Sequence, residues 1–411
     1  MASTRLEKTF TASNRKTFTI STWVKRGAIT VNNTIYGAGT SDSTDRDYLV
    51  FLQDSGEEDK LYFNAKVSNS TVAQFYTNRR FRDVGAFYHI VLAFDTTQAT
   101  DTNRMKLYVN GELQTFQSVT YPNQNRDMNT NNTVHKIGST IGNGQYFDGS
   151  MTHFNFIDGT AYAPTSFGEV DSTSGIWKAK SSPSVTYGTN GFFLKMENSG
   201  AMGTDSSGNG NNFTVSGTLT QNVDTPDNNF ACINGIAQGT YNLTLTTGNN
   251  TVYCTDNAWR SAFSTFALSS GKYYFEVKRV GSSPYMWVGI IDQSQLSGTV
   301  GISELQTVTR GYAYKASGEK GNSSSVASWG NAYAQNDIVG CALDFDNGKI
   351  YFSKNGVWEN SGDPTSGSTG TGSMYNLASG YDYLIGTSLY STSAGASFNF
   401  GNGYYGTTAV A

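Results

Sequence analysis

The acids Glu169 and Asp171 are the nearest approach in this sequence to a hydrolytic site. Glycosidic bond hydrolysis uses one carboxylic acid as the proton donor and a second carboxylate as nucleophile or base. A catalytic strand of the form Glu-x-Asp-x-x-Glu would supply such acids. Here Ser174 stands where the third acid would be, and the surrounding segment is rich in Gly and Ser rather than strand-like. The pattern therefore argues against glycosidase chemistry.

Nucleophilic catalysis by a Ser-His-Asp arrangement is poorly supported as well. The sequence contains three histidines, His89, His135 and His153, and lacks the Gly-x-Ser-x-Gly elbow of hydrolases. His89 and His153 alternate with apolar residues of expected strands. We expect them to be solvent-facing or partly satisfied strand residues rather than bases or metal ligands, and we predict that the chain is not an enzyme.

An oxygen-rich loop at 204–211 raises the question of calcium. Asp205 and Asn209 offer the hard oxygen ligands that Ca²⁺ prefers, and the glycines between them give flexibility. The alternative, which we favour, is a loop closed by Asx turns without metal. Apart from calcium at these two residues, we expect no cofactor.

Aromatic side chains in the second half could form a platform for a ligand. A flat ring that faces solvent offers apolar area, with a polar group at its edge, to a sugar or peptide. Trp329 and Tyr333 lie in the polar segment 328–333 and are the better candidates for exposure, and Tyr312 is a third candidate. Core packing is an equally good interpretation of these residues, and Trp287, in an apolar run, is expected in the core.

Composition excludes several classes of partner. Only 15% of the 411 residues are charged, the formal net charge is −4, and no basic stripe is present, so a nucleic-acid partner is not expected. No run approaches 18 apolar residues, and the start MASTRLEKTF has no apolar signal region. We therefore expect synthesis in a cytoplasm without a signal peptide and without membrane insertion.

The three cysteines, Cys232, Cys254 and Cys341, are widely spaced. An odd number without close spacing favours neither a disulfide framework nor a zinc cluster. The sequence leaves open whether Cys232 and Cys254 pair, and it predicts a buried thiol at Cys341.

Apolar residues recur with a period of two in short runs bounded by Gly, Asn, Asp or Ser. Examples are 17–24, 61–67, 105–109, 273–277 and 339–345. This pattern is typical of antiparallel strands, and no long stretch has helical periodicity. The fold class predicted is all-β, as two tandem antiparallel β-sandwiches.

A similar hairpin occurs once in each half. Residues 106–111 and 349–356 both follow an alternating strand and end in Asn-Gly, which favours a two-residue turn. Between them, 198–229 is rich in Gly, Ser and Asn. We predict a first domain over 1–222, a linker over 223–235 and a second domain over 236–411.

Two charge clusters, 57–60 and 79–83, combine acids and bases over a few residues. Such short mixed runs are usually solvated, and we expect both clusters to lie in solvent-exposed loops.

The first part resembles the laminin-G-like (concanavalin-type) jelly rolls of marine bacteriophage virion proteins. The resemblance covers about residues 1–220 and rests on the stretches 18–27, 87–95, 106–111, 147–159, 164–168 and 205–211. In the usual order an Asp-Ser-Ser-Gly-Asn-Gly stretch stands near the start of the domain, whereas here it follows the last strands. We therefore expect 192–196 to fold back into the first sandwich as a permuted strand, with the 205–211 loop beside it.

The second part resembles a SPRY domain, another two-sheet jelly roll. The matching stretches, in the order of the family, are 271–277, 288–291, 311–314, 336–346, 348–356 and 396–401. Such domains are binding modules that usually recognise peptides or proteins through loops.

Together the resemblances imply a phage protein on the virion surface, either a tail-fibre or tail-tip adhesin or a head decoration. It would bind host surface polysaccharide or protein, and other virion proteins, through loops of the sandwiches. The alternative is a structural cement or decoration that binds only virion proteins, and a glycan-degrading enzyme is the least favoured hypothesis. The sequence leaves open whether the chain forms a homo-oligomer.

Overall fold

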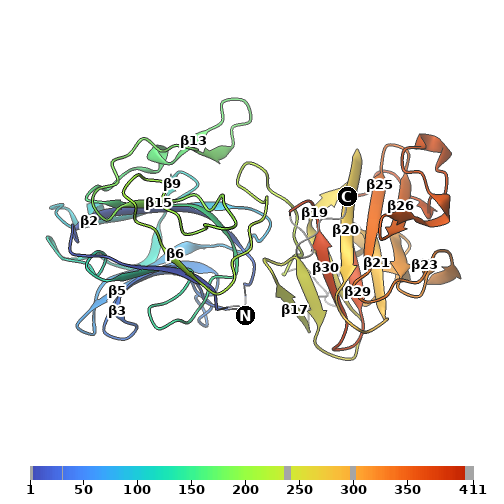
Figure 1. Cartoon of the computed structure of the whole chain (residues 1–411), viewed down its shortest axis with the longest axis horizontal. Coiled ribbons are helices and arrows are strands. Elements are labelled where there is room, and N and C mark those ends of the chain that lie inside the picture. The colour runs from blue at the N-terminus through green and yellow to red at the C-terminus, as the bar shows by residue number, and fades with distance from the viewer. Residues whose placement is uncertain (1–2, 30, 236–241, 297–301, 403–411) are drawn as a thin grey trace. The chain divides into compact units, whose positions relative to one another are not determined.

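The computed structural model describes residues 3–29, 31–235, 242–296 and 302–402. The chain divides into two compact units, unit 1 (Met1–Asn229) and unit 2 (Phe230–Ala411) (Figure 1). The described residues form antiparallel strands and short 3-10 turns, with no α-helix among them, which confirms the predicted all-β class. Residue 236, where the second domain was expected to begin, and both chain ends, 1–2 and 403–411, lie outside the described residues.

Unit 1 contains an eight-stranded sheet, a six-stranded sheet and a two-stranded hairpin. In spatial order the larger sheet consists of β10 (Phe116–Thr120), β6 (Ser70–Arg80), β5 (Lys60–Val67), β4 (Asp45–Phe51), β3 (Asn33–Ser41), β11 (Val134–Ile137), β1 (Arg5–Thr9) and β16 (Thr214–Ser216). The smaller sheet consists of β15 (Phe192–Leu194), β12 (Gly149–Asp158), β2 (Thr17–Arg26), β7 (Tyr88–Asp95), β8 (Met105–Val109) and β9 (Glu112–Leu113). The hairpin pairs β13 (Gly168–Val170) with β14 (Trp177–Ala179), and the 3-10 turns are η1 (Asp101–Asn103) and η2 (Pro164–Ser166).

The core of unit 1 lies between the two sheets. Phe18, Ile20 and Val24, which the period of two placed on one face of β2, belong to this core, and the residues between them are buried as well. Rings from opposite sheets meet in this layer, for example Phe63 of β5 and Phe94 of β7, whose centroids are 5.1 Å apart. Burial of this apolar surface, at roughly 25 cal/mol per Å², holds the sheets face to face.

Residues 192–194 form a strand that joins the smaller sheet of unit 1. β15 pairs antiparallel with Phe154–Phe156 of β12, and the 205–211 loop lies beside it because Asp205 Oδ1 accepts a hydrogen bond of 2.9 Å from the Phe193 N–H. β16 then pairs with β1. Unit 1 is therefore completed by a segment that follows its other strands in sequence.

Both Asn-Gly hairpins form. The turn residues Asn110 (φ 50°) and Gly111 (φ 85°) join β8 to β9, and Asn355 (φ 49°) and Gly356 (φ 82°) play the same part in unit 2. Positive φ at both positions is what a type I′ turn requires, and Asn and Gly tolerate it best.

Unit 2 is also built from two facing sheets. The larger contains β17 (Leu243–Thr246), β18 (Thr251–Cys254), β30 (Gly395–Asn399), β20 (Lys272–Arg279), β25 (Ile338–Asp344), β26 (Lys349–Lys354) and β27 (Val357–Trp358), with β28 (Tyr375–Asn376) also paired to β26. The smaller contains β19 (Arg260–Leu268), β29 (Tyr383–Leu389), β21 (Met286–Asp292), β22 (Gly311–Lys315), β23 (Glu319–Asn322) and β24 (Ser325–Ser328). The 3-10 turns are η3 (Gln293–Leu296), η4 (Leu305–Thr307), η5 (Glu359–Ser361) and η6 (Gly367–Thr369).

The interior of unit 2 follows the predicted alternation with one exception. Phe275, Val277 and Cys341 are buried, and Trp287 is in the core as expected. Tyr273, which shares the periodicity of Phe275, is 43% exposed instead. It is the second residue of β20, so the alternation is correct but the sandwich does not cover this end of the strand.

Residues 223–235, expected to be a linker, contain residues that pack within each unit. In unit 1 the Asp224 carboxylate forms a buried ion pair of 2.8 Å with Lys25. In unit 2 Ile233 belongs to the hydrophobic core.

The three cysteines are buried, as expected for Cys341, and the Cys254 thiol donates a hydrogen bond to the Asp256 carbonyl (3.2 Å).

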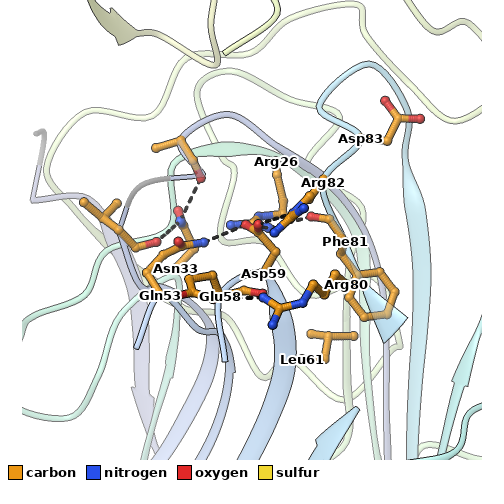
Figure 2. A network of polar contacts seen from close by, with 12 residues as sticks. Arg26, Asn33, Gln53, Glu58, Asp59, Leu61, Arg80, Phe81, Arg82 and Asp83 are labelled. Carbon is orange, nitrogen blue, oxygen red and sulfur yellow. Dashed lines mark hydrogen bonds and ion pairs between the residues drawn. The ribbon is translucent and has the colours of Figure 1, made fainter. Parts of the chain in front are cut away.

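The fold brings the two charge clusters together, and the first of them is partly buried (Figure 2). β5 pairs with β6 so that Lys60 lies opposite Arg80, which places the first cluster next to the second. Asp59 is buried and accepts hydrogen bonds from Arg26 (3.0 Å) and Arg82 (2.8 Å). The expectation was wrong for Asp59, whose partner Arg26 is distant in sequence, whereas Arg79, Arg82 and Asp83 of the second cluster are exposed as expected.

Arg26 is the most deeply placed member of this network. Its side chain has no exposed surface, donates through Nη1 to Asp59 and to the Phe81 carbonyl, and lies over the Phe51 ring at 4.6 Å. Within the described part of the chain, its Nε and Nη2 atoms have no hydrogen-bond partner. Burial lowers the pKa of Arg26 and Asp59 opposes that effect, so the guanidinium depends on this one carboxylate.

Replacement of Asp59 by Ala should therefore leave a buried, uncompensated charge. We expect the free energy of unfolding of unit 1 to fall by about 3–5 kcal/mol. Arg82→Ala, which removes a partner that is 55% exposed, should cost less than about 1 kcal/mol. Hydrogen exchange of unit 1 peptides across a urea series measures both, and equal effects of the two variants would contradict the argument.

Asp47 gives unit 1 a pH dependence of its own. Burial raises the pKa of its carboxyl to about 6, although Asn129 and Thr130 donate hydrogen bonds to it. Below pH 4 the group is neutral in both the folded and the unfolded chain. Between pH 4 and 6 the unfolded chain ionises first, so the contribution of Asp47 to stability is lost as the pH rises.

The stability of the native protein relative to Asp47→Asn should therefore decrease by on the order of 2 kcal/mol between pH 4 and 7. Urea unfolding of unit 1 at a series of pH values measures this difference. A constant difference would show that the folded-state pKa is not raised.

Candidate ligand-binding sites

Two of the three aromatic residues chosen from the sequence are core residues. Tyr333 is only 2% exposed, and its hydroxyl donates toward the carbonyls of Met286 (3.3 Å) and Tyr314 (3.2 Å). Tyr312 is buried against Tyr375 and Tyr383. Of the two interpretations that the sequence left open for Tyr333, the structure shows core packing: its ring points inward although its neighbours in sequence are polar.

Trp329 is half-buried at the end of β24. Its ring meets Tyr314 edge-on at 5.4 Å, and Tyr333 contacts the same Tyr314 ring at 5.3 Å. The structure thus brings Trp329 and Tyr333 together around Tyr314, while Tyr312 contacts other rings. A ligand-binding role for Trp329 stays a prediction.

Asp205 organises the loop that was considered for calcium. Its carboxylate accepts hydrogen bonds from the N–H groups of Phe193, Ser207 and Asn211 and from the Ser207 hydroxyl, at 2.8–2.9 Å. Asn209 donates through its amide to the carbonyls of Gly188 and Gly191. This is the geometry of an Asx-turn loop. Over the described residues, no group of three or more His, Cys, Asp or Glu is arranged to hold a metal ion.

His89 forms a buried pair with Ser21 that superficially resembles a catalytic pair. Nε2 of His89 lies 2.9 Å from Ser21 Oγ, and Nδ1 accepts a hydrogen bond of 2.9 Å from Trp177 Nε1. A neutral imidazole that accepts at Nδ1 carries its proton on Nε2, so it donates to Ser21 and does not activate it. The ring is stacked against Trp23 and Trp177, and burial lowers its pKa to about 3.

The carboxylates at 169 and 171 occupy the β13–β14 hairpin. Glu169 lies within a short strand, contrary to expectation, and is exposed. Asp171 forms an ion pair of 3.0 Å with Lys178, and the N–H of Ser174 is the main reason that its pKa is lowered. Asp171 thus closes the hairpin turn as an ionised group.

A cluster of three aromatic residues forms a surface feature of unit 2 that the sequence did not single out. Trp259, Tyr285 and Tyr390 flank the ends of β19, β21 and β29, which are neighbours in the order β19-β29-β21. Tyr390 contacts Trp259 and Tyr285 with centroids 5.6 Å apart in each case, and Trp259 and Tyr285 are 6.5 Å apart. We call these three residues the strand-end aromatic cluster.

The fold holds the cluster in place and leaves one of its three rings exposed. The Tyr390 N–H donates to the Tyr285 carbonyl (3.1 Å), Ser283 Oγ donates to the Tyr390 carbonyl (3.0 Å), and Trp259 packs on a part of the core. Tyr285 is 50% exposed. Serines 391 and 393 follow directly in the chain and add hydroxyls. Apolar ring area bordered by hydroxyl groups is suited to a sugar face. The sequence contained one indication of this cluster, because each of the three rings directly precedes or follows an apolar strand.

Unit 1 contains a cavity of about 490 Å³. It is lined by β1, by the first half of β12, and by residues 195–197 and 219–225. Much of the lining is apolar, with the side chains of Met151, Met196, Met202 and Leu219 contributing to it. A cavity of this size is in the range of small-molecule and peptide side-chain sites.

Comparison with known proteins finds a domain-family match within each unit. Residues 3–163 match the model of the concanavalin A-like lectin/glucanases superfamily (laminin G type), and residues 272–378 match the SPRY domain model. A laminin-G-like domain and a SPRY domain are therefore present in the predicted order. Domains of these two families typically bind ligands rather than catalyse reactions.

Among curated proteins, the chain is similar to the ATP-dependent RNA helicase DDX1 of Xenopus laevis, with 32% identity over 98 residues. The match covers 24% of this chain and 12% of the helicase. The Drosophila melanogaster Ddx1 helicase is 29% identical over 106 residues and is covered to 13%. The chain thus spans about an eighth of the length of these relatives.

Solved structures with partial similarity include the SPRY domain of human HERC1, with 15% identity and a TM-score of 0.31 over 38% of this chain and 91% of that domain. Stonustoxin is 14% identical, with a TM-score of 0.33 over 41% of this chain and 27% of the toxin. In the part of the chain that the structure describes, no helix is long and apolar enough to cross a membrane.

If Asp205 acts through hydrogen bonds, its removal should loosen the loop whether or not calcium is present. We expect Asp205→Ala to destabilise unit 1 by about 1–3 kcal/mol, because several backbone N–H groups lose their acceptor. The loss should be the same in EDTA and in millimolar CaCl₂, as read by hydrogen exchange at 192–211. Calcium-dependent protection in the native protein that disappears in the variant would instead identify a metal site.

Proposed function

We propose that this chain is a bacteriophage virion surface protein that binds host surface glycan through unit 2. The strand-end aromatic cluster carries the proposal, because the exposed Tyr285 ring is held by two partly buried rings at the ends of neighbouring strands. The two binding-type domains and the resemblance of the first part to marine phage virion proteins support it. The protein would lie on a tail fibre, a tail tip or the head of the particle.

The physical fit to a glycan is specific. Sugars present a flat C–H face that stacks on aromatic rings and a ring of hydroxyls that exchange hydrogen bonds. A phage particle presents many copies of a surface protein, so weak single contacts would add up to avidity. A small net charge of −4 does not oppose approach to a polysaccharide.

Purely structural cementing of the virion is the second candidate. The observation that favours it is the β13–β14 hairpin of unit 1, where Val170 and Ile176 are exposed. Exposed aliphatic side chains of this kind suit contacts with other virion proteins. Electron microscopy of labelled particles would distinguish tail tips, expected for an adhesin, from heads or tail shafts.

Removal of one ring should weaken glycan binding. We expect Tyr285→Ala to reduce retention on bacterial surface polysaccharides by about tenfold, because an exposed ring at the centre of a contact contributes on the order of 1–2 kcal/mol. Tyr273→Ala is the matched control, since Tyr273 is similarly exposed on the other sheet of unit 2. A glycan array followed by titration calorimetry measures both.

The control variant should bind like the native chain. Equal losses in the two variants, or retention no better than that of an unrelated jelly roll, would contradict glycan binding by the cluster. Release of reducing sugar from the same polysaccharides would point to the enzymatic hypothesis instead.

A further inference from the structure

β12 is paired along one edge and only half paired along the other. β2 pairs with β12 from Gly149 to Asp158, whereas β15 covers only Phe154–Phe156. A register shift between Thr152 and Asn155, with His153 at a φ of 49°, marks a bulge at the point where the coverage stops. Within the described residues, 149–153 therefore has no strand neighbour on the side away from β2.

The ladder fixes which backbone groups face this open edge. The Gly27 N–H donates to the Asp148 carbonyl at 2.8 Å, next to the pair of Gly149 with Arg26. In an antiparallel ladder, hydrogen-bonded and non-hydrogen-bonded pairs alternate. The pairs of Gly149 with Arg26 and of Met151 with Val24 are thus non-hydrogen-bonded, and the N–H and C=O groups of Gly149 and Met151 point away from β2.

The cavity of unit 1 lies along this same open edge. Residues 149–153 form one wall, and the thioether side chains of Met151, Met196 and Met202 line it. Methionine is unbranched and polarisable, so it adapts to apolar groups of different shape. The charged side chains that line the cavity are paired: Lys195 lies 3.9 Å from Glu197, Arg5 pairs with Glu7, and Asp224 pairs with Lys25 at 2.8 Å.

We propose that this cavity is a strand-addition site, in which an extended, uncharged and apolar peptide segment of a partner protein pairs with residues 149–153 of β12. A second backbone is the ligand whose donors and acceptors repeat with the spacing of an open strand edge. Its alternate side chains would enter the methionine-lined cavity. A charged peptide would meet no unpaired opposite charge there.

The proposal concerns unit 1 and does not depend on glycan binding by unit 2. If it holds, the chain recognises partners in two chemically different ways: by rings on one unit and by a strand edge on the other. Strand addition would also provide a means of attachment to another protein.

Backbone methylation of a probe peptide tests the proposal directly. The probes are acetylated, amidated octapeptides that alternate threonine with leucine, valine or methionine, each made with and without N-methyl groups on alternate backbone nitrogens. With the full-length chain, we expect at least one unmethylated probe to bind and its methylated form to bind at least tenfold more weakly. Hydrogen exchange should show protection of 149–153 on binding.

Two variants test whether the probe peptides bind in this cavity. Met196→Glu puts a charge in the cavity and should weaken binding at least tenfold, whereas Leu113→Glu, at an exposed position of unit 1, should change it less than twofold. The absence of binding by every unmethylated probe would overturn the proposal. Equal binding of methylated and unmethylated forms would overturn it too, because the cavity would then be a site for apolar groups alone. Protection elsewhere than 149–153 would have the same consequence.

Discussion

A buried ion pair between Arg26 and Asp59 joins the two sheets of unit 1. Arg26 ends β2 in the smaller sheet, and Asp59 directly precedes β5 in the larger one, so their contact of 3.0 Å fixes one end of the sandwich. The guanidinium has no exposed surface, and a buried charge is tolerated only with a well-placed partner. Because Arg26 lies opposite Gly149 in the β2–β12 ladder, the same contact helps to position the open half of β12.

Local pattern was sufficient to predict several strands and turns of this fold. The alternation in β2 and β8, the Asn-Gly turns, and the late position of the 205–211 segment each depend on neighbours in sequence or on a simple topological inference. The charge clusters could not be predicted in the same way. Whether Asp59 is solvated or buried depends on Arg26, which is 33 residues distant, and on the β5–β6 register.

The surroundings of the candidate site residues also depend on contacts with residues that are distant in sequence. The polar neighbours of Tyr333 left exposure and core packing equally open, whereas in the structure its ring packs next to Tyr314 and its hydroxyl donates to backbone carbonyls. In contrast, Trp259, Tyr285 and Tyr390 form a cluster only because β29 lies between β19 and β21. Strand order in an antiparallel sheet is set by long-range pairing, so a pattern of single residues does not reveal which strand ends meet.

Both candidate surfaces depend on parts of a sandwich that the sheets leave uncovered. In unit 2 these are rings at the ends of neighbouring strands, and in unit 1 a strand edge that β15 covers only in part. The side chains between the sheets are closely packed, so that a change of one methylene group already affects stability. Residues at strand ends and open edges are less closely packed. Their side chains and hydrogen-bonding groups are therefore available for recognition while the core keeps them in fixed positions.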